Sequence, residues 1–250
     1  MWGLKPAALY LFAPPLLMCG GMALFGGRGA DRVIADSGNF YYAAGVLATV
    51  WILSRRSRKR GSSLRQDSVL EFGNLDRKRL GLLAAAGVGL AVFVSAVITV
   101  APFPQSLIES YRSSSAGLRE GRDRLLAMAT TLVLAPAAEE IVFRGYMLGR
   151  FLSWFTQRQA VFLSAAVFAL CHVSLLWMIY ACFMGLLLAW VSIREDNTVY
   201  SIALHIGFNS SIVLTCLIGG EDSLPVILLG GAALILGVTA LDLYRREEIK

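Results

Sequence analysis

The sequence has little charge for its length: only 16% of its 250 residues are Asp, Glu, Lys or Arg, whereas 56% are hydrophobic. A soluble domain carries roughly 25% charged residues because polar side chains have to cover its core. The composition therefore excludes a soluble globular protein, and its high apolar content excludes a disordered chain. The four cysteines are scattered through apolar runs with no Cys-x-x-Cys spacing, which excludes a disulfide scaffold. An integral membrane protein remains.

Apolar runs that are long enough to cross a membrane recur along the chain. A spanning helix needs about 20 mostly apolar residues, and these runs are continuously apolar, which favours helices over the alternating strands of a barrel. We expect an all-α, polytopic membrane protein with about eight transmembrane helices. The predicted spans are residues 7–26, 39–54, 80–101, 125–149, 159–175, 176–193, 200–219 and 224–243. The second span is short, and the fifth and sixth are divided only near Ser174, so a total of about seven stays open.

Basic residues gather on one side of these predicted spans. The loop 55–79 holds nine of them, and loops rich in Lys and Arg face the cytoplasm. Alternating loops then place 16 of the 23 Lys and Arg residues on that side, with both termini cytoplasmic. An anionic inner leaflet accounts for the net charge of +6. We therefore expect the chain to have the lipid bilayer, and no nucleic acid, as a partner. We expect it to lie in the inner membrane.

The predicted spans divide one integrated membrane domain into three parts. Residues 1–124 form the N-terminal membrane helices and include the cytoplasmic basic loop 55–79. Residues 125–219 form a helical core, and residues 220–250 form a C-terminal membrane helix and tail.

Two adjacent carboxylates interrupt the fourth predicted span, at Glu139 and Glu140. An ionisable group at the centre of a spanning helix costs about 2.5–3.5 kcal/mol on insertion scales, so such groups are candidates for function. Glu140 lies four residues before Arg144, which predicts an ion pair on one helix face. Glu139 lies about 100° around the helix from Glu140 and faces another direction.

The only two histidines of the chain, His172 and His205, both fall within predicted spans. His205 and Asn209 are four residues apart, which stacks their side chains on one helix face. A buried carboxylate such as Glu139 can take a proton from water with help from an imidazole. A second imidazole and an amide can donate hydrogen bonds to an oxyanion. These four side chains supply the parts for peptide hydrolysis without a covalent intermediate.

Two histidines and a glutamate are also a plausible three-ligand zinc set, although the His-Glu-x-x-His spacing is absent. The helix boundaries put His172 and His205 toward opposite membrane faces, each about 7–8 Å from a common level. Convergence of the two imidazoles therefore requires tilted helices, a kink at Pro136 or shifted boundaries.

Three motifs occur in order on successive predicted helices and together resemble one family. They are Glu-Glu-x-x-x-Arg at 139–144, Phe-x-x-x-His at 168–172 and His-x-x-x-Asn at 205–209. The pattern resembles the type II CAAX prenyl endopeptidases and their bacterial relatives, the CPBP intramembrane glutamic proteases. The resemblance covers roughly residues 125–219 and implies an all-helical intramembrane endopeptidase with a membrane-associated protein or peptide as substrate.

The resemblance also implies residue roles. Glu139 would be the general base that activates water, His172 would assist it, and His205 with Asn209 would form the oxyanion site. Supporting roles fall to Glu140, Arg144 and Phe168. No metal or other cofactor is implied, with zinc as the weaker alternative. Two other functions stay open: a non-catalytic immunity or scaffold protein, and a proton-coupled transporter, which the missing internal repeat disfavours.

Overall fold

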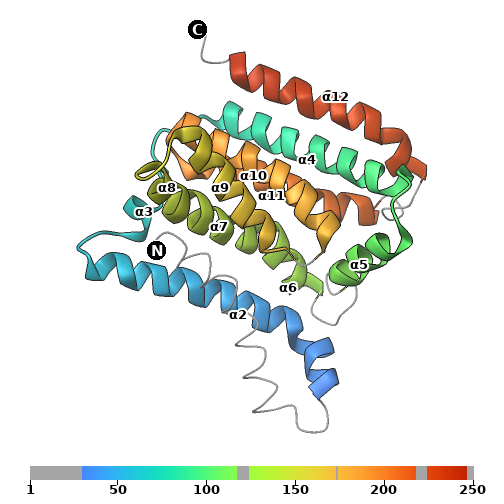
Figure 1. Ribbon diagram of the computed structural model, residues 1–250, viewed down its shortest axis with the longest axis horizontal. Coiled ribbons are helices and arrows are strands. Elements are labelled where there is room, and N and C mark those ends of the chain that lie inside the picture. Colours follow the sequence, from blue (N-terminus) through green and yellow to red (C-terminus); the bar gives the residue numbers. More distant parts are fainter. Residues whose placement is uncertain (1–29, 117–123, 173, 218–223, 247–250) are drawn as a thin grey trace.

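A computed structural model of the chain describes residues 30–116, 124–172, 174–217 and 224–246. Over these residues the secondary structure is entirely helical (Figure 1). The first predicted span, 7–26, lies outside them. The elements are α2 (Ala30–Lys59), α3 (Leu64–Asp67), α4 (Arg77–Val100), α5 (Gln105–Ala116), α6 (Arg124–Ala129), η3 (Thr130–Leu134), α7 (Ala135–Glu140), η4 (Ile141–Leu148), α8 (Gly149–Leu152), α9 (Gln157–Leu170), α10 (Leu175–Glu195), α11 (Thr198–Leu217) and α12 (Leu224–Arg246), where η marks a π-helical segment.

Three described helices are long and apolar enough to cross a membrane: Arg77–Val100, Leu125–Leu152 and Leu175–Glu195. They coincide with the third, fourth and sixth predicted spans, so the all-helical membrane class is confirmed. The division expected near Ser174 is also present, because Ser174 is the N-cap of α10 and accepts a hydrogen bond from the Trp177 N–H at 3.2 Å. By contrast, α9 has 14 residues, about 21 Å of helix, which is shorter than a full crossing.

The helices stack in successive layers, from α12 through α4, then α10 with α11, then α9 with α7, to α2 (Figure 1). Glycines allow the closest approaches between layers. A Cβ on Gly87 of α4 would lie 2.2 Å from the Leu204 carbonyl oxygen of α11, and one on Gly89 would lie 2.5 Å from the Ala233 oxygen of α12. Side chains larger than hydrogen at these positions would push α4 away from both neighbours.

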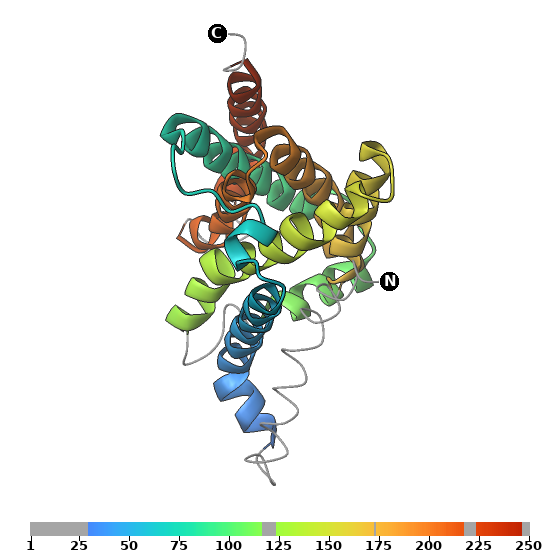
Figure 2. The same ribbon diagram turned by 90° about the vertical axis from the view of Figure 1, so that its left-hand side faces the viewer.

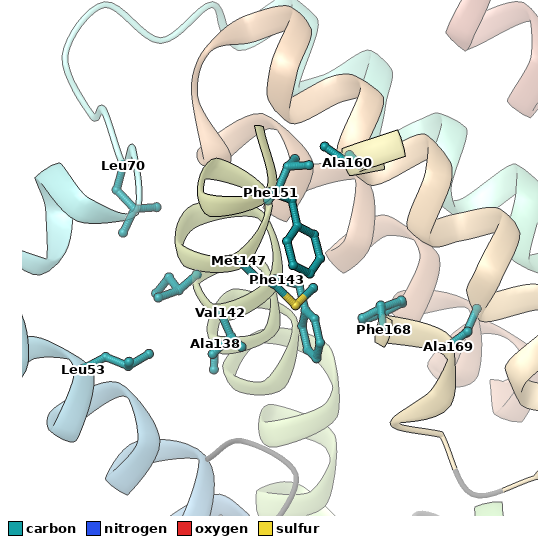
Figure 3. Packing of buried hydrophobic residues seen from close by; sticks show 14 of the residues in the cluster. Leu53, Leu70, Ala138, Val142, Phe143, Met147, Phe151, Ala160, Phe168 and Ala169 are labelled. Atoms are coloured by element: carbon teal, nitrogen blue, oxygen red, sulfur yellow. The ribbon is translucent and has the colours of Figure 1, made fainter. Parts of the chain in front are cut away.

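Residues Leu125–Leu152 form one continuous helix, here called the motif helix, that contains two π-helical segments on either side of α7. Its apolar side packs into a core with α2, α9 and α10, in which Val142, Phe143 and Met147 are fully buried (Figure 3). Because the apolar side of the motif helix faces this core, its burial fixes the directions in which the polar side chains of the same helix point.

Candidate active site

Glu140 is held by Arg144 of its own helix and by His205 of α11. Its side chain is completely buried, and its Oε1 accepts a 2.7 Å hydrogen bond from Nη1 of Arg144, so the expected ion pair is present. Arg144 also donates from Nη2 to the Gly185 carbonyl oxygen of α10, at 3.2 Å, and its guanidinium lies 4.5 Å from the ring centroid of Phe168. The motif helix is thereby fixed to both α9 and α10 at the level of Glu140.

His205 lies between the two glutamates, which the sequence did not predict. Its Nδ1 is 3.0 Å from Glu140 Oε1, the same oxygen that Arg144 contacts. Its Nε2 is 3.6 Å from Glu139 Oε2. A carboxylate that is already paired with an arginine can only accept, so the hydrogen of this bond resides on Nδ1 of His205. The Nε2 atom is then the one that faces Glu139.

His172 lies just beyond the end of α9, in the turn before α10, rather than inside a helix. Its Nδ1 is 3.0 Å from the Phe168 carbonyl oxygen. Since a carbonyl can only accept, Nδ1 carries hydrogen and Nε2 is the atom able to take a proton. Phe168 brings the two histidines together, because its ring centroid lies 4.9 Å from that of His172 and 5.8 Å from that of His205.

Asn209 connects α11 to the first π-helical segment of the motif helix. Its Nδ2 donates a 2.9 Å hydrogen bond to the carbonyl oxygen of Thr131. The Ala135 N–H bonds to Thr130 oxygen, as in a π-helix, and Pro136 has no N–H to offer the next carbonyl. Asn209 thus satisfies a carbonyl that the helix itself leaves without its regular donor, and it keeps a second amide hydrogen.

The structure therefore gathers Glu139, Glu140, Arg144, Phe168 and His205 around one buried point, with His172 packed on Phe168 and Asn209 one turn along α11. Sequence reasoning missed two members of this surrounding. Trp177 lies against His172 at 5.2 Å between ring centroids, and no motif pointed to it. The other is Thr131. The sequence signal for it is Pro136, five residues later, which has no N–H to offer the Thr131 carbonyl.

The zinc alternative would require Glu139, His172 and His205 to converge on one ion. Both Nδ1 atoms are engaged, one by Glu140 and one by a backbone carbonyl, so only the two Nε2 atoms could serve as ligands. Across the part of the chain that the structure describes, no group of three His, Cys, Asp or Glu side chains is arranged to hold a metal ion.

Residues 121–211 match the family model described as Type II CAAX prenyl endopeptidase Rce1-like. This segment is similar to the CAAX endopeptidases. The resemblance indicated by the three motifs is thereby confirmed, and the Rce1-like segment contains all of the residues discussed above. At the level of the family, the match supports a membrane protease. No curated protein and no solved structure matches the chain.

Proposed function

We propose that the protein is an intramembrane endopeptidase that cleaves a membrane-associated protein or peptide with water activated by Glu139. The observation that carries this proposal is the position of His205, held between two glutamates within an apolar helix bundle. If His205 served only to pack helices together, Glu140 would be a sufficient partner and Glu139 would not be needed at its other ring nitrogen. The Rce1-like segment supports the same class of reaction.

In the proposed reaction, Glu139 accepts a proton from water while the water oxygen attacks the carbonyl carbon of the scissile bond. The C–N bond then breaks, and the proton passes from Glu139 to the departing amine. We assign the orientation of this water to Nε2 of His172. No metal ion or other cofactor takes part in this scheme.

The negative oxygen that develops on the carbonyl needs donors, and we assign this role to His205 and Asn209. His205 has to carry hydrogen on Nε2 as well as on Nδ1 in order to donate. Glutamates on either side of the ring compensate the charge of such an imidazolium. Glu140, Arg144 and Phe168 act as supports, because they fix the ring plane of His205 and the position of the motif helix.

The proposal includes the membrane arrangement expected from the sequence. We propose about eight spans in the inner membrane, of which α9 is a short one, with both termini and the loop 55–79 on the cytoplasmic side. Residues 1–124, 125–219 and 220–250 then form the N-terminal helices, the catalytic core and the C-terminal helix of one membrane domain.

The test compares the wild type with Glu139→Gln in liposomes that contain a fluorogenic prenylated Cys-a-a-X peptide or an unprenylated peptide library. Loss of the general base should lower cleavage at least about 100-fold. Glu109→Gln, an exposed glutamate of α5, serves as the matched control and should cleave like the wild type.

If the wild type cleaves no added peptide, native substrates are tested by comparing the membrane proteomes of cells that carry the wild type or Glu139→Gln. Accumulation of uncut tails in the Glu139→Gln cells supports the proposal. Identical proteomes together with an intact biological activity of Glu139→Gln would reject it in favour of a non-catalytic membrane partner. Solute movement without peptide hydrolysis would indicate a transporter.

A further inference from the structure

Residues 62–76, here called the strap, connect α2 to α4 and contain the short helix α3. Figure 2 shows α3 lying between the end of α2 and the motif helix. None of the three sequence motifs includes the strap, and it lies outside the Rce1-like segment. Its contacts nevertheless fall on the two helices that carry Glu140 and His205.

The first set of contacts joins the strap to the motif helix. A Cβ on Gly145 would lie 2.5 Å from the Ser68 Cβ and 2.6 Å from its Cα, so only glycine lets Ser68 pack there. The next residue, Tyr146, has its hydroxyl in hydrogen-bond contact with Ser57 at the end of α2. Ser57 in turn donates to Asp67 Oδ2 at 2.6 Å, so the hydrogen between Tyr146 and Ser57 comes from the tyrosine.

Asp67 gathers the strap at this point. Its carboxylate accepts hydrogen bonds from Ser57, Ser62 and Arg60. Burial raises the pKa of Asp67, but these hydrogen bonds and the charge of Arg60 outweigh it, and the pKa lies below its ordinary value. The carboxylate is therefore ionised at neutral pH and holds the strap closed on the end of α2.

The second set of contacts joins the strap to the beginning of α11. Thr198, its first residue, donates from its N–H to the Val69 oxygen at 2.9 Å and from Oγ1 to the Ser68 oxygen at 2.7 Å. Asn197 makes two hydrogen bonds with the backbone of Glu71, accepting at 3.2 Å and donating at 2.9 Å.

Val69 has a φ of +51°, which is unfavourable for a β-branched residue. Its carbonyl nevertheless meets the first N–H of α11, and the following residue, Leu70, is buried against the motif-helix core (Figure 3). The surrounding contacts thus impose this backbone conformation on the strap.

Ser68 is the residue at which the two sets of contacts meet. Its Cα and Cβ rest on Gly145, its carbonyl accepts from Thr198, and it is completely buried. We propose that Ser68 is a positioning residue, a spacer that sets the separation of the motif helix and α11. Glu140 lies five residues from Gly145, and His205 seven residues from Thr198, which is about 7.5 Å and 10.5 Å along the helix axes. A displacement at the strap is therefore transmitted to the Glu140–His205 contact.

The catalytic consequence of this inference rests on the proposed function, but its geometric core is testable without a substrate. Because the chain has only two histidines, ¹⁵N-histidine labelling gives two imidazole spectra, which the His172→Gln variant assigns. The hydrogen on Nδ1 of His205 should give a downfield proton signal from its contact with Glu140. Thr198→Val and Gly145→Ala should each shift or broaden this signal and leave the His172 signal in place.

Two further variants separate positioning from general damage. Thr198→Ser keeps the hydroxyl and should restore the wild-type His205 signal. Thr156→Val removes a capping hydroxyl whose hydrogen bonds are with Gln159 of α9 and not with the strap, and should change neither histidine. An unchanged His205 signal in Thr198→Val overturns the proposal, as does failure of Thr198→Ser to restore a signal that valine has altered. Gly145→Ala is scored only if it folds, and Thr198→Val decides the question alone if it does not.

If the wild type cleaves peptide, Thr198→Val should lower kcat about 10- to 100-fold, as a displacement of about 1 Å does, with KM nearly unchanged. An equal effect on KM alone would contradict the positioning role. If the wild type cleaves nothing, the proposed function fails, and the His205 signal still decides whether the strap sets the helix separation.

Discussion

At the scale of single residues, neutralising the two adjacent glutamates should affect stability to different degrees. Glu140→Gln leaves the buried Arg144 guanidinium without its counter-charge, which costs about 3–5 kcal/mol of stability when one partner of a buried pair is lost. Glu139 is 3.6 Å from His205 and has 12% of its side chain exposed, and Glu139→Gln leaves the Glu140–Arg144 pair intact, so it should cost less stability than Glu140→Gln. Thermal unfolding in detergent measures both.

This contrast separates support from catalysis. Both variants should lose cleavage, but Glu140→Gln should unfold earlier than Glu139→Gln. Equal destabilisation by the two substitutions would contradict the division of roles between these neighbouring side chains.

The residues of the candidate site were predictable from spacing along single helices, and their partners across helices were not. The four-residue interval from Glu140 to Arg144 predicts their ion pair, because such an interval returns to the same helix face. The contact of Glu140 with His205 depends on how α11 packs against the motif helix, which no local pattern encodes. The offset expected between His172 and His205 is absent because α9 ends early and both rings pack on Phe168.

At the scale of elements, the π-helical segment before α7 should depend on Asn209. Asn209→Ala leaves the Thr131 carbonyl without its donor, which costs about 1–3 kcal/mol for a buried polar group. Pro136→Ala restores an N–H within reach of that part of the helix. In the Pro136→Ala background, Asn209→Ala should therefore cost less.

Four proteins, the wild type, each single variant and the double variant, measure this coupling by their unfolding midpoints. The matched control is Asn197→Ala, an asparagine that bonds the strap backbone at Glu71, whose cost should not depend on residue 136. Additive effects of Asn209→Ala and Pro136→Ala would show that the proline does not create the need for the amide.

Element boundaries followed from the sequence where a cap or a charge marks them. The expected division lies at Ser174, which caps α10, and the charged residues 77–79 open α4. The short helices α3 and α5 were missed, because an amphipathic or single-turn helix gives no long apolar run. The two π-helical segments were also missed, since Pro136 predicts a kink without specifying which carbonyls change partner.

At the scale of the whole molecule, the proposed orientation rests on charge. Arg56, Arg58 and Lys59 end α2 exposed, and α3 and α5 lie at opposite ends of the bundle (Figure 1). The basic end should face the cytoplasm because moving a cluster of positive charges across the membrane during insertion is unfavourable. The sequence alone supplies this expectation, and packing between helices adds nothing to it.

Single cysteines on a background without native cysteine test this orientation. Arg58→Cys should react with an impermeant maleimide only in inverted vesicles or permeabilised cells. Arg112→Cys, an exposed arginine of α5, should react in intact spheroplasts and serves as the matched control. The reverse labelling pattern would place the strap outside, and it would then have to close the motif helix and α11 from the other face of the membrane. Only α4 separates the two positions in the proposed topology. Equal labelling of both cysteines from one side would therefore mean that α4 does not cross the membrane.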